Sequence, residues 1–334
     1  MKYARLGDTG LEVSRICLGT SGYGDPARGH SMNAGSQVRS WTLDEREARP
    51  LFKHAIDLGV IYFDTANVYS YGASEEITGR ALRDFAKRED VVITTKLWNA
   101  MRPGPNGRGL SRKAILHEID ASLARLRTDY VDVYMIHRWD DATPIEETME
   151  ALHDVVRAGK ARYLGASSMH AWQLAKAQRV AAMHGWTRFV VMQNHYNLLN
   201  REEEREMNPQ CVDMGVATTP WSPLARGLLA RAPNAAPTRR SETDTLTKGL
   251  YGHTVDADAP VLAALDEVAQ RRGLRHAQVA LAWLLQRPSV VAPILGATKT
   301  EHLDDAARAL DVVLTREDID ALETPYVPHD PAGF

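Results

Sequence analysis

The sequence predicts a closed (β/α)8 (TIM) barrel with an N-terminal β-hairpin and extra C-terminal helices, formed as one domain by residues 1–334. Eight short apolar segments alternate with helix-like segments, and this alternation predicts parallel strands joined by right-handed crossovers. An open doubly wound sheet would need a Gly-x-Gly-x-x-Gly turn after its first strand, and residues 19–22 read Gly-Thr-Ser-Gly instead. Eight units at this length, with no break in composition, therefore favour the barrel.

The predicted elements follow in order along the chain. Residues 2–14 indicate a hairpin with its turn at 7–10, and the polar stretch 21–41 is too long for a plain connection, so we expect a functional or mobile loop there. The strands of the barrel are expected at 15–18, 60–64, 91–96, 130–137, 161–166, 189–194, 216–221 and 290–295. The helices are expected at 42–59, 74–87, 111–127, 143–159, 171–184, 200–214, 260–272, 276–287, from 301 onward and at 316–322, with an irregular region at 230–258. Thr42–Glu45 indicates a capping box, and Thr143–Pro144 an N-cap followed by proline.

The composition excludes several classes of protein. Hydrophobic residues make up 44% of the chain and charged residues 25%, as in folded globular proteins. The net charge of -3 gives no general attraction to nucleic acid, and no apolar run approaches the roughly 20 residues that span a membrane. The N-terminus lacks the apolar core of a signal peptide, so we expect a cytoplasmic protein. No His-x-x-x-His or Cys-x-x-Cys pattern occurs, so we expect no metal site. Nothing in the sequence indicates an oligomeric state.

Three predicted strands end on a side chain capable of acid–base chemistry. Asp64 ends the second strand of the barrel, Lys96 the third and His137 the fourth, and Tyr69 follows the second strand. Catalytic residues of such barrels lie at the C-terminal ends of the strands, so we expect these four at one rim. Each of these residues, taken alone, also has a purely structural explanation. Asp64 and Lys96, for example, suit a structural ion pair. All four at equivalent positions favour a catalytic set.

These four groups suit the protonation of a carbonyl oxygen while a hydride arrives at carbon. A free tyrosine has a pKa of about 10, and a nearby ammonium group is expected to lower that pKa by stabilising the phenolate. An aspartate would keep the lysine charged, and a histidine N–H would hydrogen-bond the substrate oxygen. A lysine at a strand end also suits a Schiff-base aldolase, but Asp64 argues against it because a carboxylate keeps the amine of Lys96 protonated.

Motifs along the whole chain resemble those of the aldo-keto reductases, and most closely the bacterial reductases related to the potassium-channel β-subunits. The matching segments are 64–69, 79–82, 95–96, 136–139, 165–168, 193–198, 221–224 and 293–297. The resemblance implies an NADPH-dependent oxidoreductase that reduces an aldehyde or ketone to the alcohol, with Tyr69 as the proton donor. The channel-associated relatives leave open a cofactor-sensing partner subunit with little turnover.

The resemblance also implies a cofactor site. Ser167, Ser168 and Gln193 would contact the nicotinamide amide, although the family usually has asparagine at the position of Ser168. Trp221 would stack on the nicotinamide ring. The expected cofactor residues are Thr20, Asp64, Ser167, Ser168, Gln193, Trp221, Ser222, Pro223, Leu224, Arg226, Gly227, Gly296, Thr298, Lys299 and His302.

A phosphate site is expected where the last strand leads into a helix. Thr298 and Lys299 place a hydroxyl and a cation at that helix N-terminus, which suits a ribose 2′-phosphate and favours NADPH over NADH, although ordinary N-capping would also explain them. Arg226 is a second candidate phosphate ligand. His302 and Ala306 stand where the family commonly has the glutamine and asparagine that bind adenine.

The substrate pocket is expected among the loops that follow the first four strands of the barrel, together with the C-terminal tail. Its candidate wall residues are Tyr23, Trp41, Asn67, Trp98 and Trp139. These residues predict an apolar pocket that accepts aromatic groups on a small carbonyl substrate.

Overall fold

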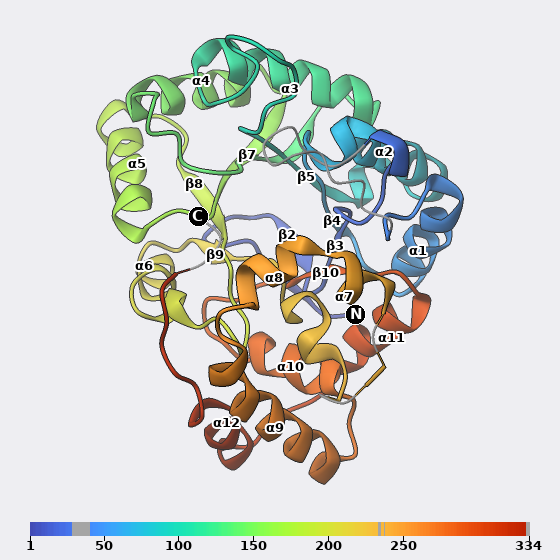
Figure 1. The fold of residues 1–334 in the computed structure, drawn as a ribbon. Helices are drawn as coiled ribbons and strands as arrows, with labels where there is room; N and C mark the ends of the chain where they lie inside the picture. The colour runs from blue at the N-terminus through green and yellow to red at the C-terminus, as the bar shows by residue number, and fades with distance from the viewer. Residues whose placement is uncertain (29–40, 233–234, 237, 332–334) are drawn as a thin grey trace.

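The computed structural model describes residues 1–28, 41–232, 235–236 and 238–331. Its main sheet has eight parallel strands in the order β10-β3-β4-β5-β6-β7-β8-β9, surrounded by helices (Figure 1). The strands are β3 (Cys17–Gly19), β4 (Tyr62–Asp64), β5 (Val92–Leu97), β6 (Val131–Ile136), β7 (Ala161–Ser167), β8 (Phe189–Gln193), β9 (Ala217–Thr218) and β10 (Ile294–Gly296). The predicted (β/α)8 barrel is confirmed.

The barrel closes between β9 and β10. The Val291 N–H donates to the Thr218 carbonyl and the Ile294 N–H to the Pro220 carbonyl, both at 2.9 Å. The seam is short because Pro220 has no N–H to donate, so regular pairing ends at Thr218 rather than at residue 221 as expected.

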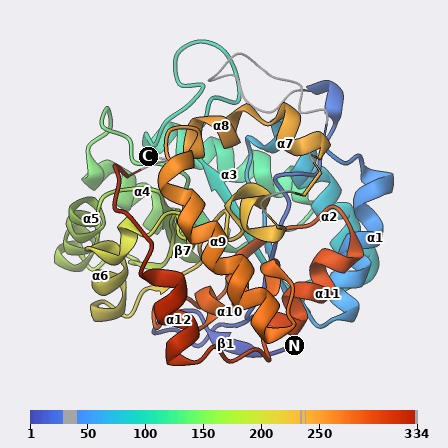
Figure 2. The same ribbon diagram turned by 60° about the horizontal axis from the view of Figure 1, so that its bottom comes forward.

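Each strand of the barrel is followed by at least one helix, in the predicted order. The helices are α1 (Glu45–Asp57), α2 (Ala73–Phe85), α3 (Arg112–Leu126), α4 (Ile145–Arg157), α5 (Ala171–His184), α6 (Met207–Asp213), α7 (Arg239–Thr243), α8 (Thr245–Tyr251), α9 (Val255–Arg272), α10 (His276–Leu285), α11 (Thr300–Ala309) and α12 (Arg316–Glu323). Figure 2 shows α7 and α8 at one end of the barrel and β1 at the other, with α12 beside α9. None of the helices in the described part of the chain is long and apolar enough to cross a membrane.

The N-terminal hairpin packs under the amino-terminal ends of the strands. It pairs β1 (Tyr3–Arg5) with β2 (Glu12–Ser14), and the Asp8 N–H in its turn donates to the Gly215 carbonyl at 2.8 Å. Gly7 has a φ of 62°, and a Cβ there would lie 2.5 Å from the Gly215 carbonyl oxygen, so this position requires glycine.

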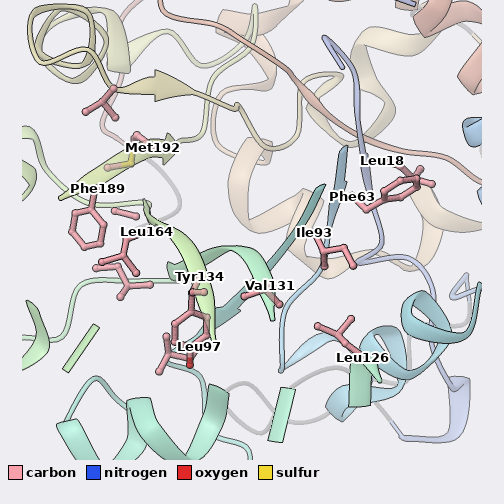
Figure 3. Packing of buried hydrophobic residues seen from close by; sticks show 14 of the residues in the cluster. Leu18, Phe63, Ile93, Leu97, Leu126, Val131, Tyr134, Leu164, Phe189 and Met192 are labelled. Carbon is pink, nitrogen blue, oxygen red and sulfur yellow. The ribbon is translucent and has the colours of Figure 1, made fainter. Parts of the chain in front are cut away.

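Two apolar layers hold the barrel together. One fills the lower interior, where Tyr62 and Val133 are fully buried. The other lies between strands and helices, and Figure 3 shows Phe63, Tyr134 and Phe189 in it. Consecutive residues of one strand enter different layers because strand side chains alternate between the two faces of a sheet.

Two predicted segments have different secondary structure. The single helix expected at 200–214 is a 3-10 helix, η5 (Glu202–Glu204), followed by α6. The break occurs because Glu206 leaves helical geometry (φ −139°, ψ −50°) and α6 restarts with Pro209 in its first turn, where a missing N–H costs least. The region expected to be irregular at 230–258 contains α7, α8 and the start of α9. Side chains of Thr238 and Asp244 cap the first two of these helices.

The helix caps also differ from those expected. In α1, Asp44 is the N-cap and forms a reciprocal capping box with Glu47, rather than Thr42 with Glu45. Before α4, the Thr143 hydroxyl donates to Asp140 at 2.8 Å instead of capping the helix, and Pro144 occupies the N-cap position. Most of the long loop expected at 21–41 lies outside the described residues.

Candidate active site

Strand alternation brings the candidate catalytic groups to the mouth of the barrel. Tyr62 and Val92 point into the interior. Side chains two or four residues further along a strand share that direction, so Asp64 and Lys96 also face inward, nearer the C-terminal ends of their strands. His137 directly follows β6, and its N–H donates to the Leu97 carbonyl at 2.9 Å.

Lys96 is the centre of the site. Its Nζ lies 2.7 Å from Oδ2 of Asp64, 2.8 Å from the Thr65 carbonyl oxygen and 3.4 Å from the Tyr69 hydroxyl. The side chain is 0% exposed, so these three acceptors replace the water that an ammonium group would otherwise bind. The predicted contacts of Lys96 with Asp64 and Tyr69 are therefore present.

Asp64 is held from two further directions. Gln193 donates from Nε2 to Oδ1 of Asp64 at 2.9 Å. The Thr20 hydroxyl donates to the Asp64 carbonyl at 3.0 Å and lies 2.9 Å from the Ser74 hydroxyl. Thr20 is fully buried, so it fixes the end of β4 rather than facing the open rim. The Gln193 side chain thus contacts Asp64 through its nitrogen and not through its oxygen Oε1.

Tyr69 begins the short 3-10 helix η3 (Tyr69–Gly72) in the loop after β4. The next two residues, Ser70 and Tyr71, both have a φ of 50°, a left-handed conformation uncommon for residues other than glycine. Such strain is concentrated at functional sites. The turn leaves the Tyr69 ring with its edge toward the His137 ring, at a centroid distance of 5.8 Å and an interplanar angle of 81°.

The pKa of Tyr69 differs from the sequence-based expectation. Burial raises it, and although the Lys96 ammonium acts in the opposite direction, the result lies above the ordinary value. The expectation of a net lowering is therefore wrong for this structure, because loss of water outweighs one neighbouring charge. Burial alone would lower the pKa of Lys96, but Asp64 and the phenol hold it above its usual range. Lys96 stays an ammonium and Tyr69 keeps its proton at neutral pH.

His137 has a polar partner that assigns its tautomer. The Asn99 side-chain nitrogen lies 3.2 Å from Nδ1 of His137. An amide N–H donates, so Nδ1 accepts and the ring proton lies on Nε2. His137 can thus offer an N–H to a substrate oxygen, as expected. The Arg138 guanidinium donates to the His137 carbonyl at 2.9 Å and acts electrostatically on Tyr69.

The expected nicotinamide residues form a connected group. The Trp221 Nε1–H donates to the Ser168 hydroxyl at 3.0 Å, and the Ser167 hydroxyl donates to the Gln193 carbonyl at 2.9 Å. Ser168 has a φ of 47°, which turns its side chain toward Trp221 at the end of β7. The structure therefore brings these four residues to one side of the mouth.

The turn after β9 has a left-handed backbone at several residues. Ser222, Ala225, Arg226 and Gly227 all have positive φ, with 106° at Gly227, and within the turn the Ala225 N–H donates to the Ser222 carbonyl at 2.9 Å and the Gly227 N–H to the Leu224 carbonyl at 2.8 Å. Pro223 is buried and Leu224 partly buried in the same turn. A Cβ on Gly227 would meet no atom within 4 Å, so open space lies beside this backbone.

Arg226, which is expected as a second phosphate ligand, is bonded to other residues of the protein. Its guanidinium contacts the Asp244 carboxylate and donates to the Thr247 hydroxyl at 3.1 Å. Arg240 binds the same carboxylate at 3.1 Å, and burial lowers the pKa of Arg240 to about 10. Arg226 therefore ties the turn after β9 to α8 instead of presenting a free cation.

The start of α11 remains open for a phosphate. Gly296, Thr298 and Lys299 are exposed, and a Cβ on Gly296 would meet no atom within 4 Å. Lys299 makes no salt bridge with the described residues. His302 accepts at Nδ1 from the Thr298 N–H at 3.3 Å, which leaves its ring at the edge of this site. Ala306 is fully buried and offers nothing to adenine.

Two residues expected to line the substrate pocket are buried elsewhere. Tyr23 is 1% exposed, packs beside Phe52 and donates its hydroxyl to the Ala297 carbonyl at 2.9 Å. Asn67 is fully buried and donates to Glu118 at 3.0 Å. Each polar group is therefore bonded within the protein interior, and the place of both residues in the pocket wall stays a prediction.

The three candidate tryptophans lie closer to the surface. Trp98 and Trp139 are partly buried in the loops after β5 and β6, and Trp139 meets the exposed Trp172 edge-on at 6.0 Å. Trp98 has a φ of 135°, another strained position at the rim. Trp41 is mostly buried under the Arg240 guanidinium, 4.4 Å from the ring centroid.

Several residues of this site were not predicted. Asn99 and Ser74 are polar residues in loop or helix positions that carry no motif of their own. His195 stacks on Trp221 with ring centroids 4.1 Å apart and the planes 8° from parallel. The sequence offered one indication that His195 belongs to the site: it lies two residues after Gln193, in the segment that follows β8.

Comparison with known proteins shows the family of the chain. Residues 15–326 match the model of the Aldo/keto reductase family. The chain is 45% identical to versiconal hemiacetal acetate reductase of Aspergillus parasiticus, over 98% of both chains. It is 42% identical to aldo-keto reductase AMT2 of Alternaria alternata, over 99% of this chain and 93% of that protein. A Schizosaccharomyces pombe protein that carries the name of an aryl-alcohol dehydrogenase is 41% identical, over 98% and 96%. The chain therefore belongs to the aldo/keto reductase family.

Proposed function

We propose that the chain is an NADPH-dependent reductase that converts an aldehyde or ketone to the alcohol, with Tyr69 as proton donor. The observation that carries the proposal is the contact of one buried ammonium, Lys96, with both the Asp64 carboxylate and the Tyr69 hydroxyl. A structural ion pair alone would not need a tyrosine hydroxyl as a third member. The mouth of a barrel is also where catalytic groups of this fold lie.

The side chains present fit a nicotinamide dinucleotide. Ser168, Gln193 and Trp221 offer a hydroxyl, an amide oxygen and an aromatic ring beside Asp64. The left-handed turn that includes Gly227 suits a pyrophosphate, with open space beside it. The exposed ammonium of Lys299 at the start of α11 suits a 2′-phosphate, which NADH lacks. When bound, the cofactor supplies the hydride.

The proton that the carbonyl oxygen receives in the proposed reaction comes from a residue of the chain. Tyr69 keeps its hydrogen at neutral pH because burial raises its pKa. The hydroxyl can therefore give that proton to a carbonyl oxygen as the carbon is reduced, which yields the alcohol and a phenolate. Lys96 lies close enough to stabilise the phenolate that forms, at 3.4 Å. His137 would hold the carbonyl oxygen through its Nε2–H.

The aldolase alternative is disfavoured by the same geometry. A Schiff-base lysine must lose its proton to attack a carbonyl, and its pKa is usually lowered for that purpose. Asp64 and Tyr69 instead hold the pKa of Lys96 above its ordinary value. Borohydride trapping with a carbonyl substrate should therefore leave Lys96 unmodified.

The test is oxidation of NADPH by the purified chain against a panel of aldehydes and ketones, with NADH in parallel. We expect turnover with at least one class of carbonyl and a preference for NADPH. Tight cofactor binding without turnover on any carbonyl would instead support the cofactor-sensing subunit. That outcome would also favour the channel-related branch, whereas the relatives described above carry names of fungal and yeast reductases and dehydrogenases.

A further inference from the structure

His195 covers one face of the tryptophan that is proposed to stack on the nicotinamide. The imidazole is 1% exposed and lies parallel to the Trp221 indole at 4.1 Å. The indole is also fixed at one edge, where Nε1–H donates to Ser168, and at its backbone, where the N–H donates to the Asn194 carbonyl at 2.9 Å. The face opposite His195 is therefore the one on which a second planar ring can stack.

The hydrogen bonds around His195 assign the donor and the acceptor in each contact. Asn197 accepts at Oδ1 from the Leu199 N–H at 2.9 Å, which assigns the orientation of its amide. Its nitrogen donates to the Ser222 carbonyl at 2.9 Å and to the Tyr251 hydroxyl at 3.0 Å. Tyr251 then has its own hydrogen to donate, and Nε2 of His195 lies 2.7 Å away. His195 therefore accepts at Nε2 in its neutral form.

Tyr251 connects this stack to the helices that follow β9. It is 3% exposed at the end of α8. The beginning of α8 is bonded to the turn after β9 through Asp244 and Arg226. Both the expected pyrophosphate turn and the Trp221 stack are thus anchored to the same short helix.

We propose that His195, held by Tyr251, is a positioning residue that keeps the Trp221 indole in the plane required for stacking on the nicotinamide. The inference rests on the proposed function, because it assumes that Trp221 faces the cofactor. His195 touches neither substrate nor the reacting atoms. Its removal leaves a buried gap into which the indole can tilt, so the effect falls on cofactor binding.

The chain contains a matched control. His184, at the end of α5, stacks on Trp186 with a centroid distance of 4.4 Å and an angle of 16°. This stack resembles the one at His195, but it lies in an exposed segment away from the mouth of the barrel. Loss of the His184 ring should leave cofactor binding unchanged.

The experiment is a fluorescence titration of NADPH into the wild-type chain, His195→Ala and His184→Ala, with thermal melting of each. We expect His195→Ala to raise the Kd of NADPH about fivefold, since an aromatic pair contributes on the order of 1 kcal/mol. His184→Ala should stay within about twofold of the wild type. In steady state, His195→Ala should raise the KM of NADPH more than it lowers kcat. A His195→Ala Kd within about twofold of the wild type would overturn the inference, as would equal losses in the two variants.

A second pair of variants tests the inference if His195→Ala does not fold. The double variant His195→Phe with Tyr251→Phe keeps the stacked plane and removes both partners of the His195–Tyr251 hydrogen bond, while the Asn197 amide nitrogen keeps its bond to the Ser222 carbonyl. His195→Asn keeps an acceptor for Tyr251 but removes the ring. We expect the double variant to bind NADPH more tightly than His195→Asn, and the reverse order would overturn the inference. A wild-type chain that binds neither NADPH nor NADH would contradict the proposed function itself.

Discussion

The Nζ of Lys96 lies 2.7 Å from Oδ2 of Asp64, and both side chains are almost fully buried, at 0% and 3% exposed. A buried ion pair of this kind gains little over an apolar pair, yet loss of one partner is costly because the other charge stays buried without compensation. Under the proposed function, the pair serves the chemistry of the site more than the stability of the fold.

Removal of the ammonium alone should destabilise the protein strongly. We expect Lys96→Met to lower the free energy of unfolding by about 3–5 kcal/mol at pH 7, because Asp64 is left as an uncompensated buried carboxylate. The double variant Asp64→Asn with Lys96→Met should regain much of that loss. Urea denaturation of the two single variants and the double variant measures the coupling. A Lys96→Met protein as stable as the wild type would show that the pair is solvated or uncharged.

Removal of the exposed Lys299 ammonium at the start of α11 should affect the binding of NADPH and of NADH differently. We expect Lys299→Ala to raise the Kd of NADPH about tenfold and to leave that of NADH nearly unchanged, since only NADPH has a 2′-phosphate. Lys87→Ala, another exposed lysine far along the chain, controls for loss of one surface charge. Equal losses for both cofactors would place Lys299 elsewhere than at the 2′-phosphate.

Replacement by alanine should change the stability of the protein in opposite directions at two helical glycines. A Cβ on Gly79, in α2, would lie 2.2 Å from the Leu126 carbonyl oxygen of α3, whereas a Cβ on Gly249, in α8, would meet nothing within 4 Å. We expect Gly79→Ala to destabilise the protein by about 1–3 kcal/mol through forced separation of the two helices. Gly249→Ala should stabilise it by about 0.5–1 kcal/mol through higher helix propensity. Melting of both variants checks this, and a neutral Gly79→Ala would mean that α2 and α3 pack less closely.

Glu203 should make stability depend on pH. Burial, with Glu202 nearby, raises its pKa from 4.5 to about 7, against the hydrogen bond from Asn194. Between these two pH values the folded protein holds a proton that the unfolded chain releases, so the free energy of unfolding falls as the pH rises from about 4.5 to about 7. The loss is on the order of 3 kcal/mol.

Glu203→Gln should remove this dependence and be more stable than the wild type at pH 8. Denaturation of both proteins at pH 5 and pH 8 provides the comparison. An unchanged pH dependence in Glu203→Gln would assign it to another group.

The barrel and the four rim residues were predictable because they depend on local patterns. Strand alternation alone places Asp64 and Lys96 in the interior above Tyr62, and the order of the strands places them side by side. The pairing of Arg226 with Asp244 and the stacking of His195 on Trp221 were not predictable. They depend on where α8 and the loop after β8 come to lie, which no local pattern encodes.

The pKa of Tyr69 was also not predictable from local sequence patterns. Its lysine neighbour was foreseen from the spacing of strands, but the degree of burial is set by all the loops around the mouth. The internal hydrogen bonds of Tyr23 and Asn67 were not predictable for a related reason, since their partners, Ala297 and Glu118, are distant in the sequence.

The central claim is that the Tyr69 hydroxyl donates the proton to the carbonyl oxygen. The direct measurement is single-turnover oxidation of bound NADPH by a reactive aldehyde, with wild-type protein and Tyr69→Phe compared at saturating cofactor. We predict that Tyr69→Phe binds NADPH with a Kd within about threefold of the wild type and oxidises it at least about 100-fold more slowly. Oxidation by Tyr69→Phe at a rate close to that of the wild type would contradict the account.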